Sequence, residues 1–340
     1  MKNDNNSSGN QLLTSVLGAS NRPSSRSEFE GAMEPQAGGD FSPKGSDSIP
    51  FTGIPSSSAG AAQVKKKTTK LSRAQLVEIE ELLTARDHAV LQAIKKYRFL
   101  TSDQIGRLYM TDCSTKTSRT RNQNLLLQRL SGYGLIAPLA RRVGGYGGGS
   151  TMQVWYLTEA GMRLLVLNDP GQPQRKRFTE PSTTFIEHTL AIAECAVQLI
   201  CLCRDSEDLT LELVDTEPTC WRRYRDGDRI NNLKPDLFAI TGYDGYEDRW
   251  FIEMDLGSEP MTQILDKCNA YLRYYYTGIE QKATEMFPLV VWLVKDADRK
   301  EKMKSFLREN LKDQPKMFLV ITPDELEKMI RQFIGTEELC

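Results

Sequence analysis

Residues 251–256 have the sequence Phe251-Ile252-Glu253-Met254-Asp255-Leu256, an apolar run interrupted by two carboxylates. Side chains alternate along a strand, so Glu253 and Asp255 are expected on one face of it. The apolar members of the run are then expected on the other face, packed in a core. The apolar alternation predicts a strand, and two acids on one face of a central strand predict a candidate functional site.

Strand-like and helical segments alternate on both sides of this run. Strands are predicted at 209–215, 237–241, 250–256, 289–294 and 317–321, and helices at 184–203, 261–276, 298–311 and from 322 onward. This interleaving predicts an α/β domain over residues 182–340. Asp236, after Pro235, opens the strand that precedes the acidic one, 17 positions before Glu253.

The charge of the chain is divided unevenly. Residues 86–163 hold 12 Lys and Arg against 4 Asp and Glu, whereas residues 164–340 hold 23 against 32. A basic segment beside an acidic one is expected where only the first segment meets a polyanion. The balance favours a nucleic-acid partner for the first segment.

Within the basic segment, three helices are predicted. Residues 88–97 carry an apolar stripe, and Thr101 with Gln104 forms a helix-start signal for a short second helix. A third helix over 117–131 buries leucines on one face. Its opposite face and its start carry the predicted DNA-binding residues: Thr117, Arg121, Asn124 and Gln128 for base edges, and Lys116 and Arg119 for phosphates.

Two strands around a glycine-rich turn follow this helix. The turn, residues 144–149, joins strands and opens no helix, which argues against a dinucleotide fingerprint. Arg141 and Arg142 stand at its shoulder and are predicted to contact backbone phosphates. Residues 86–166 resemble the winged helix-turn-helix family, which implies binding to double-stranded DNA. A winged helix used for protein contacts is the alternative.

The remaining segments are predicted from composition. Residues 1–63 are poor in large apolar groups and are expected to form a disordered tail, 64–85 a basic and helical lead-in, and 168–181 a linker. The winged helix then occupies 86–167. The 7 cysteines show no C-x-x-C spacing, so disulfides and structural zinc are not expected. Without an export signal or an uninterrupted apolar run of roughly 18 residues, a cytoplasmic protein without a membrane segment is expected.

The second half is similar to the PD-(D/E)XK nuclease fold, in its helix, its strand pair with Pro-Asp, and its acidic strand followed by a helix. The resemblance implies that Asp236 and Glu253 hold Mg²⁺, with Asp255 as a further ligand. Asp255 stands at the usual lysine position, and Lys267 on the next helix could restore that cation. Glu194 is a weaker candidate acid. The structural alternative pairs the carboxylates with basic groups such as Arg222 or Lys267.

Taken together, the winged helix, the motif from Glu253 to Glu259, and Lys267-x-x-x-Tyr271 resemble the replication-relaxation family. That resemblance implies a DNA-binding protein of a bacterial plasmid or mobile element, acting in replication, mobilisation or its regulation. The enzymatic alternative is a Mg²⁺-dependent DNA endonuclease that uses Asp236, Glu253 and Lys267. A homodimer, or a complex with replication or mobilisation proteins, is the further expectation, and a protein-interaction adaptor is the third hypothesis.

Overall fold

The computed structural model describes residues 71–139, 153–167 and 181–331. These residues belong to one compact unit, and a second unit, residues 21–70, lies outside the described residues. The predicted tail, residues 64–70 of the lead-in, the glycine-rich turn, Arg141, Arg142 and nearly all of the predicted linker also lie outside them.

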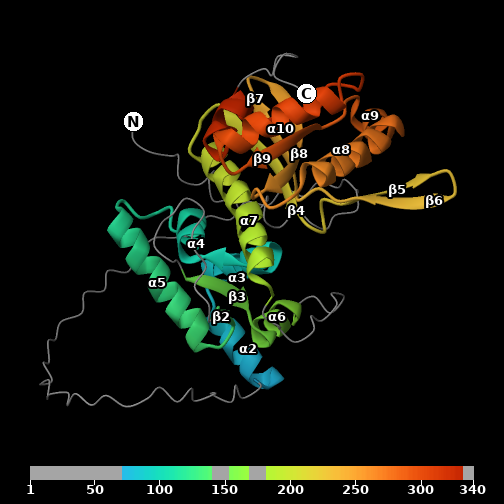
Figure 1. Cartoon of the computed structure of the whole chain (residues 1–340). Coiled ribbons are helices and arrows are strands. Elements are labelled where there is room, and N and C mark those ends of the chain that lie inside the picture. The colour runs from blue at the N-terminus through green and yellow to red at the C-terminus, as the bar shows by residue number, and fades with distance from the viewer. Residues whose placement is uncertain (1–70, 140–152, 168–180, 332–340) are drawn as a thin grey trace, which may run out of the picture. The chain divides into compact units, whose positions relative to one another are not determined.

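The first part of the described chain consists of short helices around a small sheet (Figure 1). Its elements are α2 (Arg73–Leu82), α3 (Ala85–Tyr97), β1 (Leu100–Thr101), α4 (Ser102–Tyr109), α5 (Lys116–Gly132), β2 (Ile136–Pro138), β3 (Val154–Leu157) and α6 (Glu159–Val166). The strands form an antiparallel sheet in the order β1-β3-β2. The predicted order of three helices followed by a strand pair is present.

Side-chain caps set the starts of these helices. The Thr101 hydroxyl accepts from the backbone N–H of Gln104 at 3.2 Å, and the Gln104 side chain accepts from the N–H of Thr101 at 2.9 Å. Thr115 caps α5 in the same way through Ser118. Each cap satisfies donors that the first helical turn leaves unpaired. The capping box predicted at Thr101 is therefore confirmed.

The second part is a five-stranded mixed sheet with helices on both faces, and it confirms the α/β prediction. Its elements are α7 (Thr183–Arg204), β4 (Leu209–Thr216), β5 (Arg222–Asp226), β6 (Arg229–Leu233), β7 (Leu237–Tyr243), β8 (Tyr246–Asp255), α8 (Met261–Tyr276), α9 (Ile279–Thr284), β9 (Leu289–Val294), α10 (Ala297–Asn310), β10 (Phe318–Ile321), a 3-10 turn (Pro323–Glu325) and α11 (Leu326–Arg331).

The sheet order is β10-β9-β8-β7-β4. Strands β4, β7 and β8 pair antiparallel, whereas β8, β9 and β10 pair parallel. Helices α7 and α11 pack on one face, and α8 and α10 pack on the other. The alternation predicted for β8 is confirmed, because Ile252 and Met254 lie in the α7 cluster while Glu253 faces α8.

Helix α7 connects the two parts of the described chain. It is long and apolar enough, by length and composition, to cross a membrane, but 56% of its most apolar window is buried inside the protein. One hydrophobic cluster runs from Leu76 of α2 through α7 to the sheet. Lys96 also donates to the carbonyl oxygen of Val214 at 2.6 Å, so the two parts share a core and polar contacts.

Candidate functional site

Helix α5 has a buried face and an exposed face, as predicted. Gln123, Leu126, Leu127 and Leu130 are buried against the first part of the chain. Of the predicted DNA-binding residues, Lys116, Thr117, Arg121, Asn124 and Gln128 are exposed and Arg119 is partly exposed. The structure therefore presents the predicted DNA-binding residues of this helix to solvent.

The exposed face of α5 is cationic. The helix has 17 residues and none of them is Asp or Glu. Lys116, Arg119 and Arg121 make no ion pair with any described residue, so their charges are not neutralised locally. Thr117, Asn124 and Gln128 place hydroxyl and amide groups among these cations. Such a face provides phosphate contacts and hydrogen-bonding groups for base edges.

An ion pair between a half-exposed arginine and a buried acid holds α5 against α3. Arg129, near the end of α5, donates to both carboxylate oxygens of Asp87, which is 0% exposed. Burial alone would raise the pKa of Asp87, but its hydrogen bonds to Arg129 and Thr84 lower the pKa overall. The fourth basic residue of α5 therefore has a structural role, and the three others remain available for a partner.

The acidic group of the second part lies where β7 and β8 run side by side. Leu237 pairs with Ile252 in the register, so Asp236 and Glu253 lie at the same end of this strand pair. The Oδ2 atom of Asp236 accepts from the backbone N–H of Met254 at 2.8 Å. Both acids are buried, with Asp236 at 6% and Glu253 at 2% exposed.

Two side chains of α8 contact Glu253. The hydroxyl of Tyr271 donates to its Oε1 at 2.6 Å, and Lys267 Nζ lies 3.3 Å from its Oε2. Burial and the nearby Asp236 carboxylate raise the pKa of Glu253 to about 8, against the opposing effect of Lys267. Lys267 also donates to Glu259 at 3.1 Å. The structure thus brings together the three predicted catalytic residues Asp236, Glu253 and Lys267.

Two further residues join Asp236. His188 Nε2 of α7 lies 3.2 Å from Asp236 Oδ1, and one ligand atom each from His188, Glu217 and Asp236 lies within 4.8 Å of the others. The hydrogen bond to Asp236 raises the pKa of His188. Burial and the Asp236 carboxylate raise the pKa of Glu217. Neither Glu217 nor His188 is among the predicted site residues.

Asp255, the other predicted ligand, lies apart from this group. Arg299 of α10 donates to its Oδ2 at 2.5 Å and to its Oδ1 at 3.3 Å, and the N–H of Gly257 donates to Oδ1. Both carboxylate oxygens are therefore occupied by protein donors. Glu194 also lies elsewhere, paired with Arg107 and Gln104 of α4. Arg222 pairs with Glu280 and contacts neither Glu253 nor Asp255 by a described ion pair.

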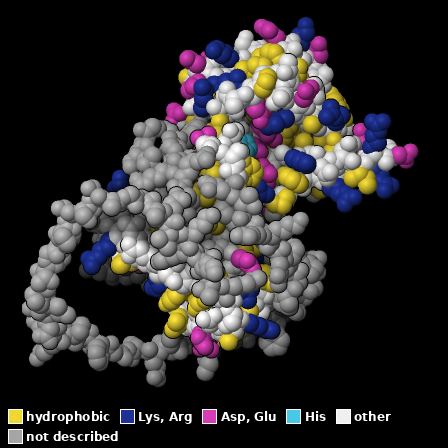
Figure 2. Space-filling model, turned by 60° about the horizontal axis from the view of Figure 1, so that its bottom comes forward, with side chains coloured by type: hydrophobic (Ala, Val, Ile, Leu, Met, Phe, Trp, Pro, Cys, Tyr) yellow, Lys and Arg dark blue, Asp and Glu magenta, His cyan; other side chains and the backbone are white. Residues whose placement is uncertain are grey.

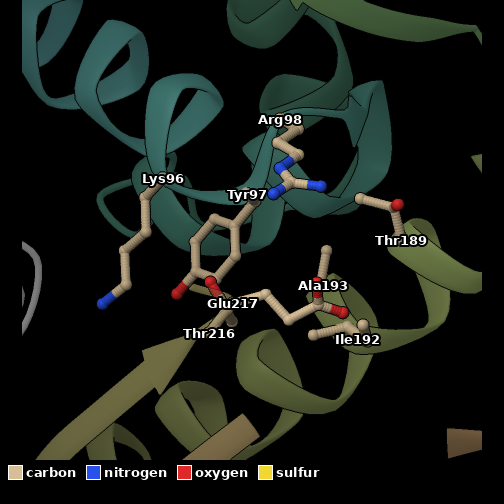
Figure 3. A pocket seen from close by; sticks show the side chains of 8 residues that line it. All are labelled: Lys96, Tyr97, Arg98, Thr189, Ile192, Ala193, Thr216 and Glu217. Atoms are coloured by element: carbon tan, nitrogen blue, oxygen red, sulfur yellow. The ribbon is translucent and has the colours of Figure 1, made fainter. Parts of the chain in front are cut away.

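A small cavity adjoins Glu217 at the contact between α3 and α7 (Figure 3). Its volume of about 20 Å³ is room for a single water-sized molecule. Arg98, which has a left-handed φ of 67°, lines this cavity together with Glu217. The Arg98 charge partly offsets the effect of burial on the pKa of Glu217. The cavity is too small for a ligand. It lies between residues of the first part of the chain and Glu217 of the acidic group.

The donor set at Asp236 suits a divalent cation. It offers one imidazole nitrogen and carboxylate oxygens, a combination used for ions such as Mn²⁺ and Zn²⁺, and its carboxylates also suit Mg²⁺. Burial and the Asp236 carboxylate raise the pKa values of Glu217 and Glu253. A bound cation would favour the ionised forms of these carboxylates. The residues that could hold such an ion are His188, Glu217 and Asp236, with Glu253 and Lys267 beside them.

A family model described as replication-relaxation matches residues 91–290. No curated protein matches the chain. Among solved structures, the crystal structure of protein VC1899 from Vibrio cholerae is similar at 13% identity and a TM-score of 0.25, over 76% of this chain and 56% of that one. The chain thus spans about half the length of VC1899, and a TM-score this low supports no inference about function.

Proposed function

The chain belongs to the replication-relaxation family, and from this premise we propose that it is a DNA-binding protein whose helix α5 contacts the duplex. Family membership indicates a role in plasmid or mobile-element replication. The proposal adds that the protein takes part in replication by binding double-stranded DNA.

The exposed face of α5 carries this proposal. A duplex has closely spaced phosphates, and a protein gains affinity by replacing their counterions with Lys and Arg. Lys116, Arg119 and Arg121 supply three cations without a described ion-pair partner, and the helix contains no acid that would repel the duplex. The α5 helix also follows α4 in the order typical of a helix-turn-helix, where the second helix enters the major groove.

The test is the salt dependence of duplex binding by the full chain. We expect the affinity to fall steeply between 50 and 200 mM salt, and Arg121→Ala to reduce the slope of log K against log salt by about 1. Lys116→Ala is expected to act similarly. Arg308→Ala, which removes an exposed arginine of α10, is the matched control and is expected to leave the slope unchanged. Affinity that does not depend on salt would exclude the proposal.

A second candidate function is a metal-dependent endonuclease, which the convergence of Asp236, Glu253 and Lys267 favours. His188, Glu217 and Asp236 would hold the divalent cation, which would supply Lewis-acid stabilisation of phosphate charge. Lys267 would add a second positive charge next to Glu253. Asp255 is not part of this candidate site, because its carboxylate oxygens accept hydrogen bonds from Arg299 and Gly257.

Plasmid nicking distinguishes the two functions. Supercoiled plasmid would be incubated with the protein and Mg²⁺ or Mn²⁺, beside Asp236→Asn and Glu253→Gln variants. If the protein is an endonuclease, the unmodified protein nicks the plasmid and neither variant does. Equal nicking by the variants would identify a contaminating nuclease, and duplex binding without nicking would leave the binding function alone. A homodimer, replication or mobilisation partners and a cytoplasmic location remain part of the proposal.

A further inference from the structure

Strands β5 and β6 form a two-stranded ribbon separate from the main sheet (Figure 1). Arg222 pairs with Leu233 at its base and Asp226 pairs with Arg229 at its tip, which leaves Gly227 and Asp228 as a two-residue turn. Gly227 has a φ of 56°, a conformation that glycine adopts without strain. An isolated ribbon is marginally stable in water, so its base must be anchored by other elements.

One face of the ribbon provides this anchor. Arg222 lies over the rings of Phe238 and Phe251 at 4.4 and 5.3 Å and donates to Glu280 at 2.8 Å. Tyr224, on the same face by alternation, packs against Tyr274 of α8, with the two ring centroids 4.9 Å apart and the rings tilted. Strands β7 and β8 and helices α8 and α9 therefore hold the inward face of the ribbon.

The other face is directed to solvent and is cationic. By alternation and register it carries Arg223, Arg225, Ile230 and Asn232, all of which are exposed. Lys234 continues this face, as its ammonium group lies 4.7 Å from the ring of Trp221, the residue opposite it. Figure 2 shows Lys and Arg side chains gathered along the ribbon.

No acid shares this outward face. Asp226 belongs to the inward face by alternation, and Asp228 lies in the turn. Arg223 and Arg225 form no ion pair with any described residue. Folding therefore exposes cations here that the rest of the described chain does not neutralise, and Ile230 remains 50% exposed beside them.

We propose that this outward face, formed by Arg223, Arg225, Ile230, Asn232 and Lys234, is a second contact with duplex DNA. The inference rests on the proposed DNA-binding function and adds a surface to it. The major groove, about 12 Å wide, admits a two-stranded ribbon. Arginine pairs with guanine edges, asparagine with adenine edges, and an apolar side chain contacts the thymine methyl group. The combination of these side chains favours DNA over an acidic protein surface, for which charge alone would suffice.

The ribbon directly precedes Asp236 of the acidic group in the sequence. Its last outward residue, Lys234, is separated from Asp236 only by Pro235, so the base of the ribbon adjoins the acidic group. Carboxylates repel phosphates, and cations next to them offset that repulsion. A duplex held by the ribbon therefore lies close to the acidic group without meeting a wholly negative surface.

The experiment compares variants of the full chain in duplex binding at several salt concentrations. The double substitution Arg223→Gln and Arg225→Gln is expected to lower affinity at least tenfold at 100 mM salt and to reduce the salt slope by about 2. Arg229→Gln removes an arginine of the same ribbon that lies on the opposite face, and it is expected to change affinity less than threefold. Thermal unfolding of each variant checks that the ribbon substitutions leave the fold intact.

The outcomes separate this inference from the proposed function. If the double variant binds like the unmodified protein while Arg121→Ala weakens binding, the ribbon inference is wrong and its cations serve another partner, such as an acidic protein. If only the ribbon variant weakens binding, the ribbon inference stands and the role of α5 is wrong. If the unmodified protein binds no duplex, both are wrong. If Arg229→Gln loses as much affinity as the double variant, the loss follows from net charge alone and the inference is also wrong.

Discussion

Arg129 of α5 donates from one nitrogen to both carboxylate oxygens of Asp87 in α3, at 2.6 and 2.8 Å. Asp87 is also bonded by the backbone N–H and hydroxyl of Thr84, at 2.9 and 2.7 Å. One buried carboxylate thus completes the cap of α3 and fixes the far end of α5. This pair, together with the buried leucines of α5, sets the orientation of the cationic face.

Arg129→Ala is expected to lower the free energy of unfolding by about 2 kcal/mol, because it leaves a buried carboxylate with fewer donors. Urea denaturation of the full chain measures the loss. Arg308→Ala serves as a control, since that exposed arginine makes no ion pair with a described residue. Equal stability of the two variants would show that the pair does not hold α5.

The stability provided by Asp87 is expected to depend on pH. Its folded-state pKa lies below the ordinary value of 3.8, so the ionised form stabilises the fold. This contribution is complete above about pH 5 and is lost as the pH falls through the folded pKa. Asp87→Asn should therefore be less stable than the unmodified protein at pH 6, with a difference that shrinks below pH 4. A constant difference in urea denaturation from pH 3 to pH 7 would contradict this.

Features set by near neighbours in the sequence could be predicted. The capping box of Thr101 and Gln104 joins residues three apart, and the faces of α5 and β8 follow from helical and strand periodicity. Charge counts could also identify the cationic segment. Local geometry determines each of these features, so one sequence suffices.

Features that depend on distant partners could not be predicted. Asp255 and Arg299 are 44 positions apart, and nothing near Asp255 indicates which cation will bond to it. Glu217 joins Asp236 only because β4 and β7 pair in a particular register. From the sequence alone, a carboxylate on a strand can be either a metal ligand or one partner of an ion pair.

The β5–β6 ribbon was missed although a local signal was present. Gly227-Asp228 is a typical two-residue hairpin turn. The flanking strands, however, are rich in Arg and Asn and lack the apolar alternation by which half-buried strands are identified. An exposed ribbon needs little apolar surface, so periodicity alone overlooks it.

Gly161→Ala is expected to lower the free energy of unfolding by about 1–3 kcal/mol through overpacking. An added methyl group at Gly161 would collide with the backbone carbonyl of Leu135 and approach Leu157 Cδ2 to 2.9 Å. Gly132→Ala is the matched control, because nothing lies within 4 Å of its added carbon, and a helical alanine should stabilise by about 0.5–1 kcal/mol. Changes of the same sign and size in both variants would rule out the steric explanation.

Asp255 and Asp236 are both buried, and the structure predicts different consequences when each is disturbed. Arg299→Ala should lower the free energy of unfolding by about 3 kcal/mol, because it strips the partner from the fully buried Asp255. The same variant should bind Mn²⁺ within twofold of the unmodified protein in calorimetry. Asp236→Asn should abolish Mn²⁺ binding, since it removes one of the three converging ligands. Loss of Mn²⁺ binding in a folded Arg299→Ala protein would place Asp255 at the metal site instead.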